Sequence, residues 1–134
     1  MDCFCRIKDM KTLLVDDDSL IRSSLSLIFM SKDCFLLAKE TAEQGLEAAK
    51  KDRFDIIISD FKLPGMDGLE FFTKVAKIQP NTVNILISGH GGNGMASKAA
   101  EVGIHHFIKK PFSLETLTDT LGPLIENHGR KKVA

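Results

Sequence analysis

Three consecutive isoleucines, Ile56 to Ile58, constrain the fold of this chain more than any other feature. They show no polar alternation, and an uninterrupted β-branched run is typical of a strand buried on both faces of a parallel sheet. The predicted strand ends at Asp60, and the turn-forming residues 63–68 follow before a predicted helix. Ligands bind beyond the carboxyl ends of such strands, so Asp60 is placed for chemistry, with a turn-capping role as the alternative.

Four further strand–helix units accompany this one. The other strands are expected at residues 12–15, 34–38, 83–87 and 106–109, and each is followed by a helical pattern. Because parallel strands need right-handed crossovers, five successive units predict an α/β fold: a five-stranded parallel, doubly wound (βα)5 sheet with helices on both faces.

Composition limits the class of protein. The chain has 134 residues, 43% hydrophobic and 27% charged, with a formal net charge of zero. A neutral single domain argues against a nucleic-acid or membrane partner. Cys3, Cys5 and Cys34 lack the paired spacing of a zinc site, and no apolar run is long enough for a signal peptide or membrane span. A cytoplasmic location is therefore expected.

The predicted domain covers residues 10–128. Residues 1–9 have no hydrophobic period and are expected to form a flexible N-terminal extension. Residues 129–134 are expected to form a flexible basic tail, in which the positive charges are solvated.

Polar side chains gather at the carboxyl ends of the predicted strands: Asp16, Asp17, Asp60, Ser88 and Lys110. Carboxylates placed in one crevice repel each other unless a cation neutralises them, and carboxylate oxygens suit Mg²⁺. A lysine and a serine beside Mg²⁺ supply the positive charge and the donor that phosphoryl oxygens need. The set therefore predicts Mg²⁺-dependent phosphoryl transfer.

Four short motifs follow the predicted strands: Leu14-Val15-Asp16-Asp17, Asp60 with residues 63–68, Ile87-Ser88-Gly89 and Lys110-Pro111-Phe112. Together they resemble the motifs of a known family, the receiver domain of two-component response regulators. The resemblance covers about residues 11 to 128 in the family's order and spacing. It implies the flavodoxin-like strand order 2-1-3-4-5 and a single-domain regulator similar to the chemotaxis regulators.

The resemblance also implies a role for individual residues. Asp60 would be the phosphoacceptor, with Asp16, Asp17, Asp60 and the backbone carbonyl of Lys62 holding Mg²⁺. Three further residues would complete the phosphoryl site: Ser88, Gly89 and Lys110, the last aimed by a cis Lys110–Pro111 peptide bond.

Switching and lifetime are assigned by the same resemblance. Ser88 and Phe107 would form the switch, and Lys62 and His90 hold the two positions that tune the lifetime of the phosphoryl group. A neutral His90 imidazole could orient or deprotonate the attacking water, whereas Lys62 only donates. The alternative is that His90 lies in solvent.

The function expected is that of a phosphorelay switch. A phosphohistidine of a sensor histidine kinase or phosphotransfer protein would pass its phosphoryl group to Asp60. The face formed by the fourth helix, fifth strand and fifth helix would then bind an unknown downstream protein target. The protein would catalyse only its own phosphotransfer and dephosphorylation, and so would not be a conventional enzyme.

Three alternatives compete with this interpretation. Residues 89–94 match the dinucleotide-binding pattern G-x-G-x-x-G, but no acidic residue follows at the required distance and the aspartates would repel a pyrophosphate. Residues 16–20 resemble the nucleophile loop of haloacid-dehalogenase-like phosphatases, which predicts a further acidic pair after Lys110. The third alternative is a receiver-like interaction module that is never phosphorylated.

Overall fold

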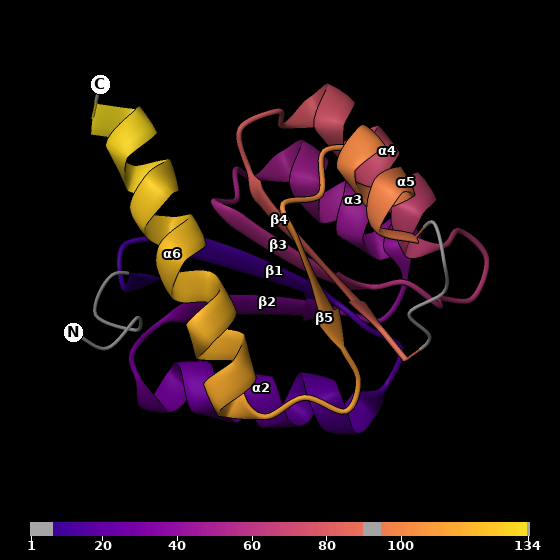
Figure 1. Ribbon diagram of the computed structural model, residues 1–134. Coiled ribbons are helices and arrows are strands. Elements are labelled where there is room, and N and C mark those ends of the chain that lie inside the picture. Colours follow the sequence, from indigo (N-terminus) through magenta and orange to yellow (C-terminus); the bar gives the residue numbers. More distant parts are fainter. Residues whose placement is uncertain (1–6, 90–94, 134) are drawn as a thin grey trace.

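Five strands alternate with five helices in the computed structural model, which describes residues 7–89 and 95–133. The elements are, in order, β1 (Lys11–Val15), α2 (Ser19–Ser31), β2 (Phe35–Lys39), α3 (Ala42–Lys51), β3 (Ile56–Asp60), α4 (Gly68–Ile78), β4 (Val83–Ser88), α5 (Met95–Glu101), β5 (His106–Lys109) and α6 (Leu114–Val133) (Figure 1). The predicted strands are all present, with β2 displaced by one residue toward the carboxyl end.

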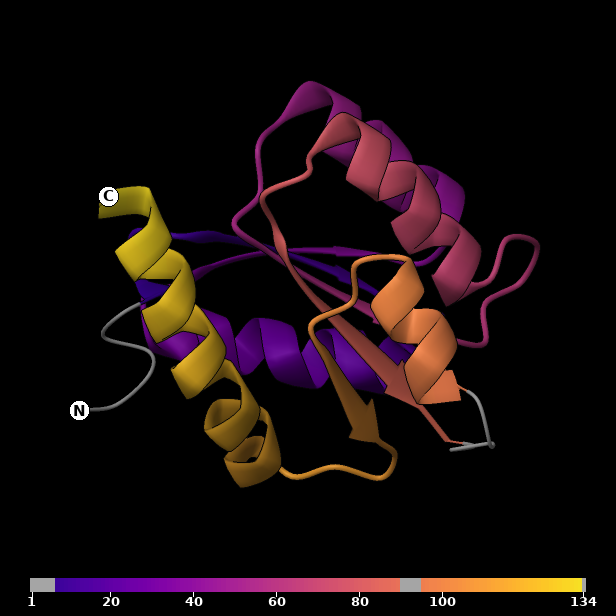
Figure 2. The same cartoon turned by 45° about the horizontal axis from the view of Figure 1, so that its top comes forward.

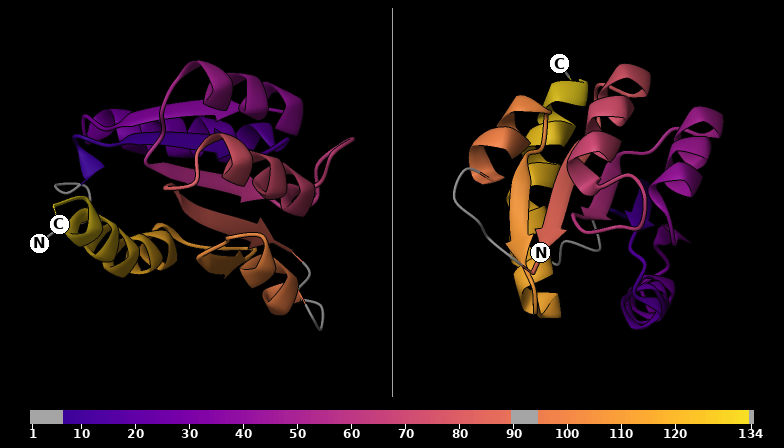
Figure 3. Two further views of the ribbon diagram at one scale, coloured as in Figure 1. Left: turned by 90° about the horizontal axis from the view of Figure 1, so that it is seen from above. Right: turned by 90° about the vertical axis from the view of Figure 1, so that its right-hand side faces the viewer.

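The sheet has the predicted topology. Its strands run parallel in the order β2-β1-β3-β4-β5, which confirms the doubly wound fold. The register sets Asp60 level with Ile87 of β4, and Ser88 level with Lys109 of β5. The arrowheads of β4 and β5 accordingly point toward the same edge in the right-hand view of Figure 3. That edge collects the residues that follow the strands.

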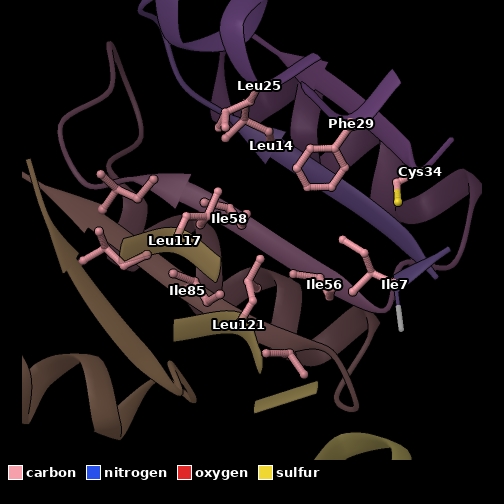
Figure 4. Close-up of a cluster of buried hydrophobic side chains, with 13 residues drawn as sticks. Ile7, Leu14, Leu25, Phe29, Cys34, Ile56, Ile58, Ile85, Leu117 and Leu121 are labelled. Carbon is pink, nitrogen blue, oxygen red and sulfur yellow. The ribbon is translucent and has the colours of Figure 1, made fainter. Parts of the chain in front are cut away.

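Each face of the sheet has its own core. The helices α2 and α6 cover one face, and α3, α4 and α5 cover the other (Figures 1 and 2). Ile58 packs in one cluster with Phe29 of α2 and Leu117 of α6 (Figure 4). Ile57 packs in the other cluster with Phe71 of α4. All five side chains are fully buried. The isoleucine run is therefore covered on both sides, as its lack of alternation predicts.

The two chain ends differ from expectation. Ile7 is 1% exposed and belongs to the core cluster of Phe29 and Ile56 (Figure 4), so the flexible extension predicted for residues 1–9 does not include it. A single isoleucine has no period and gave no signal of burial. Residues 1–6 lie outside the described residues. At the other end α6 continues to Val133, so residues 129–133 have helical backbone where the sequence predicts a flexible tail.

The helix starts near the site follow their capping residues. Asp18 accepts hydrogen bonds from the backbone N–H of Leu20 and Ile21 at the start of α2, and Asp67 accepts one from Glu70 at the start of α4. Thr41 forms a capping box with Gln44 at the start of α3. These contacts fix where α2 and α4 leave the sheet, next to the ends of β1 and β3.

Gly68 allows α4 to begin directly against the end of β3. A Cβ atom at this position would lie 2.6 Å from the carbonyl oxygen of Asp60 and 2.9 Å from the Cα of Phe61. No side chain fits there without moving the backbone of Asp60, so glycine is required by this close approach.

No helix among residues 7–89 and 95–133 combines the length and the apolar character that crossing a bilayer requires.

Candidate functional site

Three aspartates meet at the carboxyl edge of the sheet. Asp16 and Asp17 follow β1 and Asp60 ends β3, and each offers a carboxylate oxygen within 4.8 Å of the others. Asp16 and Asp60 are buried, and Asp17 is exposed. The strand ends thus bring together the three carboxylates that the sequence places at one site.

Lys110 closes this cluster from the opposite side. Its Nζ lies 3.1 Å from Oδ2 of Asp60 and 3.2 Å from Oδ2 of Asp16. The Lys110–Pro111 peptide bond is cis, as expected, and the backbone N–H of Lys110 donates to the carbonyl of Ser88 at 2.8 Å. The lysine therefore bridges two of the carboxylates, which agrees with its predicted direction.

One oxygen of Asp16 has an unusual environment. Oδ1 accepts the backbone N–H of Asp18 at 3.0 Å, but Oδ2 is fully buried and accepts no hydrogen bond from the described residues. The ammonium of Lys110 is close enough to pair electrostatically, but its geometry is not that of a hydrogen bond. A buried acceptor without a donor is costly, and a cation in the cluster would satisfy it. The three carboxylates thus fit a hard divalent cation.

Burial and mutual repulsion shift the ionisation of the cluster. Burial raises the pKa of Asp60 above its ordinary value of 3.8, and the charge of Asp17 adds to this, whereas Lys110 acts in the opposite direction. Burial also raises the pKa of Asp16. For Lys110 burial favours the neutral form, but the charges of Asp16 and Asp60 outweigh it, so its pKa is raised. Without a metal the two buried carboxylates ionise at a cost, and the lysine stays charged.

This cost predicts a pH-dependent stability change in the Asp60→Asn variant. The folded protein holds the Asp60 proton more tightly than the unfolded chain, so protonated Asp60 contributes most to stability below the unfolded pKa of 3.8. This contribution is lost as the pH rises through the raised folded pKa. Metal-free Asp60→Asn should therefore melt above wild type at about pH 7, by about 1 kcal/mol or roughly 3–6 °C, and the difference should shrink toward about pH 4.

Thermal unfolding in a chelator, followed by circular dichroism, measures this difference. Glu47→Gln is the control, because the Glu47 side chain is 63% exposed and its pair with Lys50 spans 3.6 Å. Its melting should stay within about 0.5 kcal/mol of wild type. An Asp60→Asn variant that melts at or below the wild-type temperature at neutral pH would contradict the electrostatic account.

Of the remaining predicted residues, Lys62, Ser88, Gly89 and Phe107 fall within the described part of the chain. Ser88 is 2% exposed at the end of β4, and the side chain of Lys62 is exposed in the loop after β3. Among the described residues, no heavy atom lies within 4 Å of where a Cβ on Gly89 would be. Phe107 is half-buried, level with Leu86 and packed on the second core. His90 lies outside the described residues, as does most of the G-x-G-x-x-G segment.

A groove opens beside the site, lined by residues of α2 and of the segment that joins β5 to α6. Its volume is about 510 Å³, and it is lined by Asp18, Leu20, Ile21, Ser24, Leu25, Ile28, Lys110, Pro111, Phe112 and Leu114. Leu114, in the first turn of α6, is 41% exposed here, and Leu20 is 72% exposed. An apolar surface thus adjoins the polar cluster.

One residue next to the cluster is not among the residues predicted from the sequence. Arg22 of α2 donates from Nη1 to the carbonyl oxygen of Asp16 at 2.8 Å. A signal was present, because Arg22 is the only charged residue in the sequence of α2.

The fold and the site together define a class of protein: doubly wound α/β domains with three carboxylates and a lysine at the carboxyl ends of their central strands. Residues 12–122 match the family model of the response regulator receiver domain, and the chain belongs to this family. It is a receiver domain of two-component phosphorelay signalling.

Individual relatives agree with this assignment. The chemotaxis protein CheY of Listeria monocytogenes is 35% identical over 115 residues, which cover 84% of this chain and 95% of CheY. The structure of the beryllofluoride-activated NtrC4 receiver domain dimer has a TM-score of 0.81 and 32% identity, covering 88% of this chain and 98% of that one. Neither the phosphatase nor the unphosphorylated module is favoured by these similarities.

Some relatives are much longer. The transcriptional regulatory protein GlrR of Escherichia coli is 30% identical over 114 residues, which are 85% of this chain but 26% of GlrR. The chain thus spans about a quarter of that protein's length and nearly all of CheY.

Proposed function

We propose that Asp60 accepts a phosphoryl group from a phosphohistidine on a partner protein and that this modification switches the binding of a downstream protein. The observation that carries the proposal is the position of the Asp60 carboxylate, which contacts Lys110 Nζ at 3.1 Å and lies within 4.8 Å of Asp16 and Asp17. The direct test is phosphoryl uptake from a small donor by wild type and Asp60→Asn.

The reaction is a transfer between two nucleophiles. A carboxylate oxygen of Asp60 forms a bond to phosphorus, the bond from phosphorus to the donor imidazole breaks, and the imidazole leaves with the electron pair and takes up a proton. Mg²⁺, bound by Asp16, Asp17, Asp60 and the backbone carbonyl of Lys62, would supply positive charge to the phosphoryl oxygens.

Lys110 and its neighbours serve the incoming group. The Lys110 ammonium already contacts Asp60 and keeps its charge, so it can pair with a phosphoryl oxygen without changing its protonation state. Ser88 stands at the end of the adjacent strand as a hydroxyl donor, and the open space at Gly89 leaves room for the group to enter. The acyl phosphate is then hydrolysed in place, so the protein acts on itself rather than on a released substrate.

The switch in this proposal links Ser88 to Phe107. Ser88 is level with Lys109 on β5, and Phe107 of the same strand packs half-buried on the core cluster that contains Phe71 of α4 and Ala99 of α5. When the Ser88 hydroxyl turns toward a phosphoryl group, the ring gains room to turn inward, which favours one of two arrangements of α5, β5 and α6.

Amide exchange is expected to report this switch. Phosphorylation of Asp60 should change exchange rates across α5 and β5, at residues 95–108, as well as next to the acyl phosphate. The physical reason is that a repacked Phe107 ring alters the support of both elements. Changes confined to residues in contact with Asp60 would place the output surface elsewhere.

The donor protein is proposed to dock in the groove between α2 and the β5–α6 loop. Asp60 is 6% exposed, so a donor histidine can reach it only if the donor's surface covers the rim of the site. Lys110, which contacts Asp60, and Asp18, whose backbone N–H contacts Asp16, both line the groove. A donor in position for transfer therefore contacts the apolar walls, including Leu20.

A charge in this groove should slow transfer from a protein donor. Leu20→Glu is expected to reduce the rate of phosphotransfer from a histidine kinase at least about tenfold, equivalent to about 1.4 kcal/mol, because a carboxylate must be desolvated on docking. Leu27→Glu is the matched control, since Leu27 is 65% exposed on the same helix and does not line the groove. Both variants should accept a phosphoryl group normally from a small donor. Equal loss in both would remove the groove from the docking surface.

A further inference from the structure

The hydrogen bond from Arg22 to the Asp16 carbonyl lies between two of the three clustered carboxylates. The accepting carbonyl belongs to the peptide unit that joins Asp16 to Asp17. Because the C=O and the two flanking Cα atoms lie in one plane, a hydrogen bond to this carbonyl restrains the rotation of the whole peptide unit. The guanidinium therefore restrains where the backbone of Asp17 lies.

The other groups of this loop are held by different partners. The N–H of Asp16 donates to the carbonyl of Lys39 at 3.1 Å, and the N–H of Asp18 donates to Asp16 Oδ1 at 3.0 Å. The Asp18 carboxylate in turn caps α2. Within the described part of the chain, only Arg22 holds the carbonyl between Asp16 and Asp17.

Asp17 depends on that support more than its neighbours do. Its carboxylate makes no hydrogen bond or ion pair with another described residue, whereas Asp16 and Asp60 are both buried and both contact Lys110. An exposed side chain without partners is placed by its backbone alone. The peptide held by Arg22 is the nearest part of that backbone.

The location of Arg22 is unfavourable for the helix itself. It lies in the amino-terminal half of α2, where the helix dipole disfavours a cation by about 0.3–1 kcal/mol. It forms no ion pair with a carboxylate of the described residues, so its contact is with the carbonyl and not with a side-chain charge. Side chains on a helix point back toward its amino terminus, which lets Arg22 reach residue 16.

We infer that Arg22 is a positioning residue for the metal site: by holding the Asp16–Asp17 peptide, it keeps the Asp17 carboxylate where it can bind a divalent cation. This inference rests on the proposed function, in which the aspartate cluster binds Mg²⁺. According to this inference, the contact made by Arg22 strengthens metal binding, whereas its positive charge alone would weaken metal binding.

The sign of the change in metal affinity distinguishes the two effects. Removing a cation near a cation site strengthens metal binding on electrostatic grounds. Loss of the positioning contact should weaken it instead, by about tenfold, as is typical of residues that orient metal ligands. Arg22→Met should therefore bind Mn²⁺, used as the probe, about tenfold more weakly than wild type. Lys39→Met, which removes another cation close to the loop but keeps its backbone carbonyl, should bind as tightly as wild type or more tightly.

Mn²⁺ titration followed by electron paramagnetic resonance gives these affinities without any phosphotransfer assay. The chain has no tryptophan or tyrosine, so an intrinsic fluorescence readout is not an option. In an Asp17→Asn background, Arg22→Met should weaken Mn²⁺ binding by less than about a further twofold, because the carboxylate that Arg22 positions is gone. Thermal unfolding of each variant in chelator confirms that it is folded, and Arg22→Gln, too short to reach the carbonyl, replaces Arg22→Met if the latter does not fold.

Each outcome separates this inference from the function on which it rests. Unchanged or tighter Mn²⁺ binding by folded Arg22→Met, with Asp17→Asn still weakened, would overturn the role of Arg22 alone. An undiminished effect of Arg22→Met in the Asp17→Asn background would also overturn it, because Arg22 would then act elsewhere. Wild-type binding no tighter than that of Asp17→Asn would overturn both the metal site and this inference.

Discussion

Asp60→Asn is expected to take up no phosphoryl group from acetyl phosphate and Mg²⁺, whereas wild type should take up one per chain. Of the three clustered carboxylates, Asp60 alone combines slight exposure with a direct contact to Lys110 at 3.1 Å. Asp16 is fully buried, and the exposed Asp17 has no contact with the lysine. An amide nitrogen in place of the carboxylate oxygen is not a nucleophile under these conditions, so the loss should be complete.

Intact-protein mass spectrometry measures this uptake, and Asp18→Asn is the matched control. Asparagine caps a helix as well as aspartate does, so this variant removes a neighbouring carboxylate while keeping the start of α2. It should be phosphorylated like wild type. Hydroxylamine should release the group from wild type, as expected of an acyl phosphate. Uptake by Asp60→Asn equal to that of wild type would reject Asp60 as the acceptor.

The position of the site follows from the sequence because parallel strands share one carboxyl edge. Once Ile56–Ile58 and the apolar runs near residues 12–15 and 83–87 are recognised as parallel strands, the residues after them must meet. The strand assignment alone therefore predicts that Asp16, Asp17 and Asp60 lie together, and their carboxylate oxygens lie within 4.8 Å of one another. The side chain of Lys110 reached the cluster in the expected way, from the far side of β4.

The contacts that depend on side-chain reach could not be predicted in this way. Periodicity identifies which face of α2 is buried, but it does not show that Arg22 turns back to the carbonyl of Asp16. Leu114 fits the apolar stripe of α6, yet the first turn of that helix lies where α2 leaves a groove, so the side chain is exposed. Ile7 is isolated in sequence, and its burial depends on tertiary packing in the cluster that also contains Phe29 of α2 and Leu117 of α6.

Mg²⁺ affinity should depend on Asp17 far more than on Asp18, although the two aspartates are adjacent. The Asp18 carboxylate is already engaged by the N–H groups of Leu20 and Ile21 and serves the helix. The Asp17 carboxylate has no protein partner within the described residues and lies within 4.8 Å of Asp16 and Asp60. It is thus the one carboxylate of the pair that is free to bind a cation.

Asp17→Asn is expected to weaken Mg²⁺ binding by about 100-fold, equivalent to about 2.7 kcal/mol, because it removes both a ligand and one of the charges that attract the cation. Asp18→Asn should change the affinity by less than about twofold, since it lies outside the cluster and the asparagine still caps α2. Isothermal titration calorimetry with Mg²⁺ compares the two variants directly. Equal losses in both would show that the cation binds in another part of the loop, and an unchanged affinity in Asp17→Asn would remove Asp17 from the metal site.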